Sequence, residues 1–123
     1  MPTNKILWQV CNIDDIPDPG SIGFEIGEDG RKHDVFVIHW RNSWYAYLNR
    51  CPHTGVNLNW LPDQFFDLEN ELIQCSLHGA LFRPESGLCI HGPCIGESLR
   101  NLMCFTEDGK VYIGLKNIEG IDF

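Results

Sequence analysis

The sequence has few basic side chains. It holds 9 Lys and Arg residues against 17 Asp and Glu residues, which gives a formal net charge of −8 at pH 7. Proteins that bind nucleic acids need basic patches to contact phosphates, so this balance argues against a nucleic-acid partner. An acidic protein that docks on a basic surface of another protein fits the charge better.

Long apolar segments and export signals are also missing. No apolar run approaches the roughly 20 residues that a membrane-spanning helix needs, so we expect no membrane insertion. The stretch Met1–Val10 reads as neither a secretory signal nor a twin-arginine signal, and the expected location is the cytoplasm. No internal repeat or linker interrupts the 123 residues, which predicts a single domain over 1–123.

Six cysteines are present, but a disulfide scaffold is not expected in a cytoplasmic protein. Cys11 and Cys104 are predicted to be thiols in or near the core. Cys89 and Cys94 flank a short loop. A redox disulfide between them is conceivable, although the sequence favours two buried thiols.

Cysteine and histidine come together in two short motifs. They read Cys51-Pro52-His53-Thr54-Gly55 and Cys75-Ser76-Leu77-His78-Gly79. Two thiolates and two imidazoles can bind one tetrahedral zinc ion, or they can bind a pair of irons bridged by sulfides. Zinc fingers more often pair two cysteines in one motif and two histidines in the other, whereas here each motif offers one of each. Proline and glycine beside the ligands suit tightly folded loops, and the pattern favours the iron pair.

With these motifs the sequence resembles the Rieske ferredoxins. The resemblance runs from about Trp44 to Leu115 and includes Ser86-Gly87 and Gly92-Pro93, the latter matching a proline loop that covers the cluster in that family. The segment between the two motifs is somewhat longer here than is usual in the family. The resemblance implies one [2Fe–2S] cluster per chain, with two thiolates on one iron and two imidazoles on the other. The implied ligands are Cys51, His53, Cys75 and His78.

The resemblance also implies a function. It predicts a one-electron carrier, not an enzyme, which passes electrons from a flavin reductase to a terminal oxygenase. Two alternatives are a redox-sensing or iron-sensing regulatory module and a small subunit of a larger reductase, such as a nitrite reductase. High-potential members of the family carry a hydroxyl residue and a tyrosine where this sequence has Ala80 and Phe82, and a disulfide where it has Val56 and Leu77. The low-potential, oxygenase-ferredoxin type is therefore expected.

Short apolar segments separated by turn residues predict an all-β fold. We expect a Rieske-type antiparallel β-sandwich or barrel, with a small cluster-binding subdomain over about 50–95 formed by the two ligand loops and the Gly-Pro loop. Hairpin turns are predicted at Asp29-Gly30 and Asp108-Gly109, and one helical turn near Pro62. The expected strands are 6–10, 23–26, 35–38, 44–48, 72–74, 80–82, 88–90, 102–106 and 111–115.

The remaining polar and aromatic residues are assigned structural roles. The histidines outside the motifs are predicted not to bind metal; they are His33, His39 and His91. Core and strand packing is expected for Trp40, Trp44, Tyr45 and Tyr47. Packing is also expected for Trp60, Leu61 and Pro62, with a docking surface as the alternative. A solvated acidic face is expected at Asp63, Asp67, Glu69 and Glu71.

Overall fold

The computed structural model describes residues 7–28, 31–52, 55, 57–59, 61–76 and 79–114. Within these residues the regular structure consists of β-strands and one short 3₁₀ helix, which confirms the predicted all-β class, and no helix there could span a membrane. The elements are β1 (Leu7–Asn12), the 3₁₀ helix η1 (Ile13–Asp15), β2 (Gly20–Glu28), β3 (Arg31–Trp40), β4 (Ser43–Leu48), β5 (Ile73–Gln74), β6 (Leu81–Phe82), β7 (Cys89–His91), β8 (Asn101–Glu107) and β9 (Lys110–Gly114).

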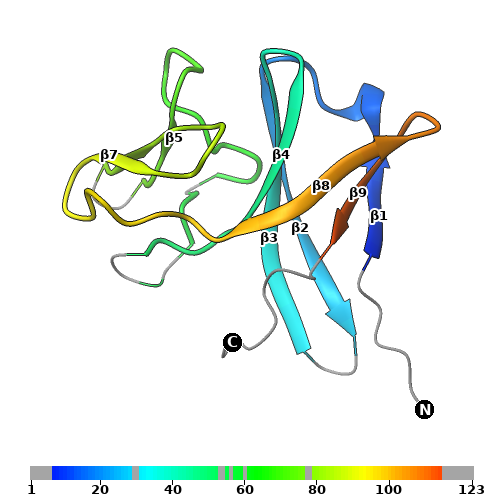
Figure 1. The fold of residues 1–123 in the computed structure, drawn as a ribbon, viewed down its shortest axis with the longest axis horizontal. Helices are drawn as coiled ribbons and strands as arrows, with labels where there is room; N and C mark the ends of the chain where they lie inside the picture. The colour runs from blue at the N-terminus through cyan, green and yellow to red at the C-terminus, as the bar shows by residue number, and fades with distance from the viewer. Residues whose placement is uncertain are drawn as a thin grey trace.

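The strands form one large and one small sheet. The large sheet has the order β1-β9-β8-β4-β3-β2 and curls into a nearly closed barrel, while β5, β6 and β7 form the small sheet. All neighbouring strands are antiparallel. Figure 1 shows the small sheet at one end of the molecule, with the hairpin of β8 and β9 at the other end. Cys51 and Cys75, the described cysteines of the two motifs, belong to the core that the small sheet helps to form.

Strand β3 lies between two hydrophobic cores and contributes side chains to both. Side chains alternate between the faces of a strand, so Val35 and Val37 point into the barrel core while Phe36 and Ile38 point into the second core. All four side chains are fully buried. The uninterrupted apolar run that predicted this strand is explained by burial on both faces.

The turn at Arg41-Asn42 and the predicted hairpin turn at Asp108-Gly109 both place residues at positive φ. Arg41 and Asn42 both have positive φ, and their N–H groups donate to the Asp18 carboxylate at 3.0 and 2.6 Å. Asp108 and Gly109 also have positive φ, as a tight two-residue hairpin requires. The predicted turn at Asp29-Gly30 lies outside the described residues, although β2 and β3 pair up to Glu28 and Arg31.

The predicted helical turn near Pro62 is wrong. The chain instead makes a single turn in which the Gln64 N–H donates to the Leu61 carbonyl at 3.2 Å. Asp63 has a φ of 66°, which does not fit a right-handed helix. Its carboxylate accepts the Gly23 N–H at 2.8 Å. This acidic residue therefore also attaches the segment between the two motifs, here called the insert, to β2.

The acidic residues of the insert divide into two groups. Glu69 and Glu71 have exposed side chains, as expected for a solvated face. The Asp67 carboxylate instead accepts the backbone N–H groups of Glu71 and Leu72 at 3.0 and 3.2 Å. Asp67 and Asp63 therefore shape the insert, in addition to adding negative charge.

Cys11 and Cys104 lie on neighbouring parts of the barrel and pack against its core, as predicted. Burial raises the pKa of Cys104 to about 12, and the nearby Cys11 adds to the shift. Burial and Asp15 raise the pKa of Cys11 to about 11. Both thiols are consequently protonated at neutral pH and poorly reactive.

We expect the free energy of unfolding to fall as pH rises from 9 toward 12. An unfolded Cys104 loses its proton near its ordinary pKa of 9.0, whereas the folded thiol keeps its proton to about 12, so ionisation favours the unfolded chain in this window. The Cys104→Ala variant should lose less stability than the unsubstituted protein between pH 9 and 11. Urea unfolding at several pH values measures both slopes, and parallel slopes would contradict the expectation.

Candidate functional site

The structure brings the two predicted thiolate ligands into one core. Cys51 follows β4 and Cys75 follows β5, and their exposed fractions are 1% and 0%. Both belong to the second core, together with Ala80 and Phe82. The second motif connects β5 to β6, and the Cys75 N–H donates to the Ala80 carbonyl at 2.9 Å.

The same kind of backbone hydrogen bond closes each of the two motifs. The Gly55 N–H donates to the Cys51 carbonyl at 2.7 Å, and the Gly79 N–H donates to the Cys75 carbonyl at 2.9 Å. Both glycines have positive φ, 78° and 70°, a conformation that costs glycine little. Each glycine lies four residues after its cysteine. This common spacing is visible in the sequence, although the glycines were considered there only as neighbours of the predicted ligands.

The two predicted imidazole ligands, His53 and His78, lie outside the described residues, and so do Thr54, Val56, Trp60 and Leu77. In sequence, each histidine falls between the cysteine and the glycine that close its loop. The ligand role of all four residues stays a prediction. Two buried cysteines in one core, each in a loop with a histidine, are a donor set that suits a two-iron cluster.

The Gly92-Pro93 loop packs against the end of the second motif. Strand β7 pairs with β6, with His91 opposite Leu81. Gly92 has a φ of 105°, and a Cβ atom at this position would lie 2.9 Å from the Ala80 Cα. Only glycine allows so close an approach, so Gly92 sets how the loop lies against the cysteine-containing core.

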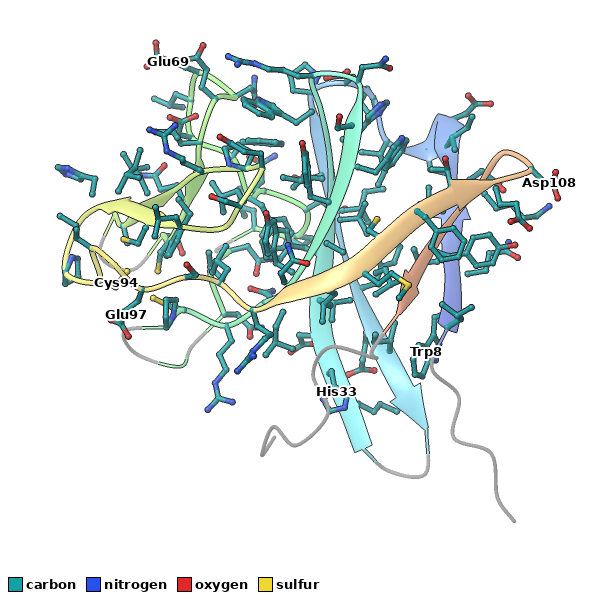
Figure 2. All side chains as sticks on the ribbon, viewed as in Figure 1. Trp8, His33, Glu69, Cys94, Glu97 and Asp108 are labelled. Atoms are coloured by element: carbon teal, nitrogen blue, oxygen red, sulfur yellow. The ribbon has the colours of Figure 1, made fainter. Side chains whose placement is uncertain are left out.

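Cys89 and Cys94 are buried thiols at the base of that loop, each 1% exposed. Their sulfur atoms lie 3.0 Å apart, and the Cys89 thiol also donates to the His91 carbonyl at 3.3 Å. Burial and the hydrogen bond with Cys89 raise the pKa of Cys94 to about 12. Figure 2 shows Cys94 and Glu97 at the end of the molecule opposite Asp108.

Among the histidines outside the motifs, His39 has a clear structural role. Its ring stacks on Trp44 with 3.9 Å between centroids, and its Nδ1 lies 2.9 Å from the Ile16 carbonyl oxygen. His91 is exposed on β7. Within the described residues, no group of three His, Cys, Asp or Glu side chains is arranged to hold a metal ion.

Known proteins match this chain in sequence pattern and in fold. The family model described as Rieske [2Fe-2S] domain matches residues 7–112. The ferredoxin of carbazole 1,9a-dioxygenase from Nocardioides aromaticivorans IC177 has a TM-score of 0.68 and 22% identity, and the match covers 89% of this chain and 98% of that chain. No curated protein sequence matches.

Two further structures contain carbazole 1,9a-dioxygenase complexes. A chain in the complex of reduced oxygenase and oxidized ferredoxin has a TM-score of 0.70 and 22% identity, covering 90% of this chain and 94% of that chain. A chain in the reduced complex between oxygenase and ferredoxin has a TM-score of 0.75 and 20% identity over 91% of this chain. This chain spans only 29% of that one. At these identities the solved structures establish the fold.

Proposed function

This chain belongs to the Rieske [2Fe–2S] domain family, and from that membership we propose that it is a one-electron carrier with no substrate chemistry of its own. The observation that carries the proposal is the pair of loops, each closed by its own glycine-to-cysteine backbone hydrogen bond, whose cysteines lie in one buried core. A match that covers 98% of a ferredoxin chain supports a carrier. Six cysteines without a recorded disulfide suit a reducing compartment, so we place the carrier in the cytoplasm.

Four side chains would hold the cluster. Cys51 and Cys75 would bind one iron as thiolates, and His53 and His78 would bind the other as neutral imidazoles. When bound, such a cluster accepts and releases a single electron. The buried cysteines exclude water from the thiolate side. Loops at one end of a small protein suit transfer to a docked partner.

We propose a flavin reductase as the electron donor and a terminal oxygenase as the acceptor. The test combines the purified chain with NADH, a flavin reductase and a Rieske oxygenase. Omitting the chain should abolish most of the electron flow to the oxygenase. A reduced chain that passes no electrons to oxygenases, yet binds a transcription regulator, would replace the carrier with the sensing alternative.

Association with these partners should weaken as salt rises. The net charge of −8 favours a basic partner face, and the Debye length falls from ~10 Å at 0.1 M salt to ~3 Å at 1 M. Stopped-flow mixing of the reduced chain with its acceptor measures the bimolecular rate. A rate that stays flat across this range would indicate apolar docking instead, for example through Leu61, whose side chain is 64% exposed.

A matched pair of variants tests which end of the molecule docks. Glu97→Gln removes a charge at the end that carries Cys94, and Asp108→Asn removes one at the opposite end (Figure 2). We expect Glu97→Gln to lower the rate at low salt on the order of twofold, and Asp108→Asn to leave it unchanged. Equal effects of the two variants would contradict docking through the small-sheet end.

A further inference from the structure

Asn49 is a buried polar side chain at the base of the first motif. It lies two residues before Cys51 and is 6% exposed, and it is the one polar or charged residue in the described ranges that is buried to this degree. Its Oδ1 accepts the Leu58 N–H at 2.8 Å, and its Nδ2 donates to the Asn59 Oδ1 at 2.9 Å. The amide therefore joins the chain entering the first loop to the chain leaving it.

Leu58 continues the connection to the second motif. Its carbonyl accepts two hydrogen bonds from Ser76, one from the backbone N–H at 2.8 Å and one from the Oγ at 2.7 Å. Ser76 directly follows Cys75. The Leu58 backbone is thus hydrogen-bonded through its N–H to Asn49, two residues before Cys51. Through its carbonyl it is hydrogen-bonded to Ser76, one residue after Cys75.

We propose that Asn49, the Leu58 backbone and Ser76 form a loop clasp that fixes the two cysteine loops relative to each other, which makes Asn49 and Ser76 positioning residues for the cluster. This inference rests on the proposed ligand role of Cys51 and Cys75. All six cysteines are described and none forms a disulfide, so no covalent bond between cysteines joins the two loops. A buried amide is retained at low cost only where both of its ends are hydrogen-bonded, as they are here.

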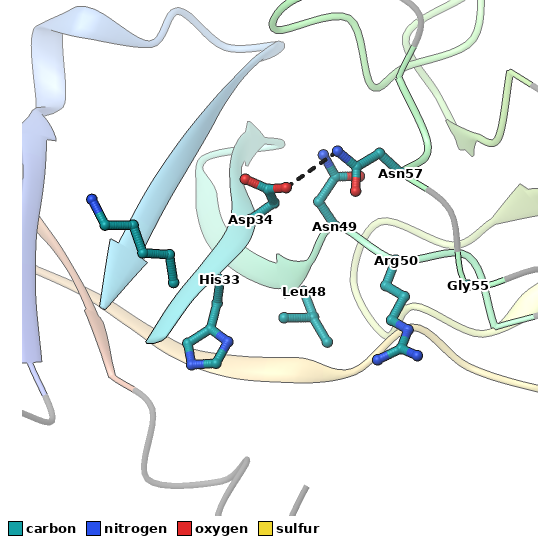
Figure 3. Close-up of a pocket in the computed structure, with 8 residues that line it drawn as sticks. His33, Asp34, Leu48, Asn49, Arg50, Gly55 and Asn57 are labelled. Atoms are coloured by element: carbon teal, nitrogen blue, oxygen red, sulfur yellow. Dashed lines mark hydrogen bonds between the residues drawn. The ribbon is translucent and has the colours of Figure 1, made fainter. Parts of the chain in front are cut away.

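The anchor of the clasp is β3. The Asn49 N–H donates to the Asp34 carbonyl at 2.8 Å, which joins the clasp to the strand shared by both cores. Figure 3 shows Asp34, Asn49 and Asn57 beside the pocket that also includes Arg50 and Gly55. The Asn57 Nδ2 lies at a longer distance, 3.3 Å, from the Asp34 Oδ2, and the Asn57 side chain is exposed. Asn57 therefore provides a control of the same residue type in the same loop.

The test compares Asn49→Leu and Ser76→Ala with the control Asn57→Leu. Leucine at position 49 keeps the size of the side chain but leaves the Leu58 N–H without its acceptor, while Ser76→Ala removes only the hydroxyl contact. In the purified protein with an iron chelator, we expect the visible absorbance to decay about tenfold faster for Asn49→Leu and about threefold faster for Ser76→Ala. The decay for Asn57→Leu should stay within about twofold of the unsubstituted protein.

A second readout can also be applied to a chain that holds no cluster. Iodoacetamide labelling followed by peptide mass spectrometry measures how fast Cys51 and Cys75 are alkylated, with Cys104 in the barrel as an internal reference. The clasp variants should accelerate labelling of Cys51 and Cys75 but not of Cys104. Unchanged labelling, or equal acceleration at all three cysteines, would overturn the clasp. A chain without a [2Fe–2S] cluster would overturn the proposed function, and labelling would still decide whether the clasp exists.

Discussion

The His53→Ala variant is expected to purify without the red-brown colour and without bound iron. Each ligand is needed to hold the iron pair, and an open position on an iron invites water and hydrolysis of the cluster. Iron and acid-labile sulfide analysis, together with the spin-resonance spectrum of the reduced protein, measures the loss. The unsubstituted chain should contain two irons and two sulfides per chain.

The matched control for this loss is His91→Ala. His91 is exposed on β7 and lies beside the Gly92-Pro93 loop, so the variant removes an imidazole from the small sheet without touching a motif. We expect it to keep its full iron content. Retention of iron by His53→Ala, or loss of iron from His91→Ala, would contradict the assignment of His53, and not His91, as a ligand. A colourless protein that holds zinc alone would favour the mononuclear alternative.

The midpoint potential is expected near the low end of the Rieske range, at about −150 mV. Hydrogen bonds to the cluster sulfurs stabilise the more negative reduced state and raise the potential. The sequence resembles high-potential Rieske proteins in its predicted ligands, but Ala80 and Phe82 stand where those proteins carry a hydroxyl residue and a tyrosine. Both side chains are fully buried in the core that contains Cys51 and Cys75, and neither has a donor.

Voltammetry at neutral pH measures this potential, and a value above about +100 mV would rule out the oxygenase-ferredoxin type. Phe82→Tyr provides the internal check. If the added hydroxyl reaches a cysteine sulfur, one net hydrogen bond of about 0.5–1.5 kcal/mol corresponds to a rise of roughly 20–65 mV for one electron. Phe105→Tyr makes the same chemical change on β8, in the barrel, and should leave the potential unchanged.

The fold was predictable where local chemistry decides the conformation. Asp108-Gly109 between apolar segments predicts a hairpin, and the apolar run 35–38 predicts a strand, because both signals are local. The limits of β2 were predicted too short, since the strand extends through Gly20 and Gly27, where no side chain marks a pattern. The helical turn near Pro62 failed because Asp63 instead adopts a positive φ and bonds to Gly23.

Some features of the candidate site could likewise be predicted from the sequence, and others could not. Cysteine and histidine at fixed spacing mark the predicted ligands in the sequence, and the structure places both cysteines in one core. Asn49 carries no such mark, because one asparagine among several near the first motif is distinguished only by its burial and its bond to Leu58. The closeness of Cys89 to Cys94 also depends on how the loop between them folds. Long-range packing decides these features, and sequence patterns do not report it.

The shared strand β3 has a consequence for protein engineering. The two cysteine loops cannot be grafted into another scaffold as segment 50–95 alone, because Phe36, Ile38 and Tyr47 form one side of their core. A transplanted cluster-binding unit must include β3 and β4. Including these strands exposes Val35 and Val37 unless the recipient protein supplies apolar side chains to cover them. The most suitable recipient is therefore another antiparallel barrel, in which β3, apolar on both faces, can replace one of the strands.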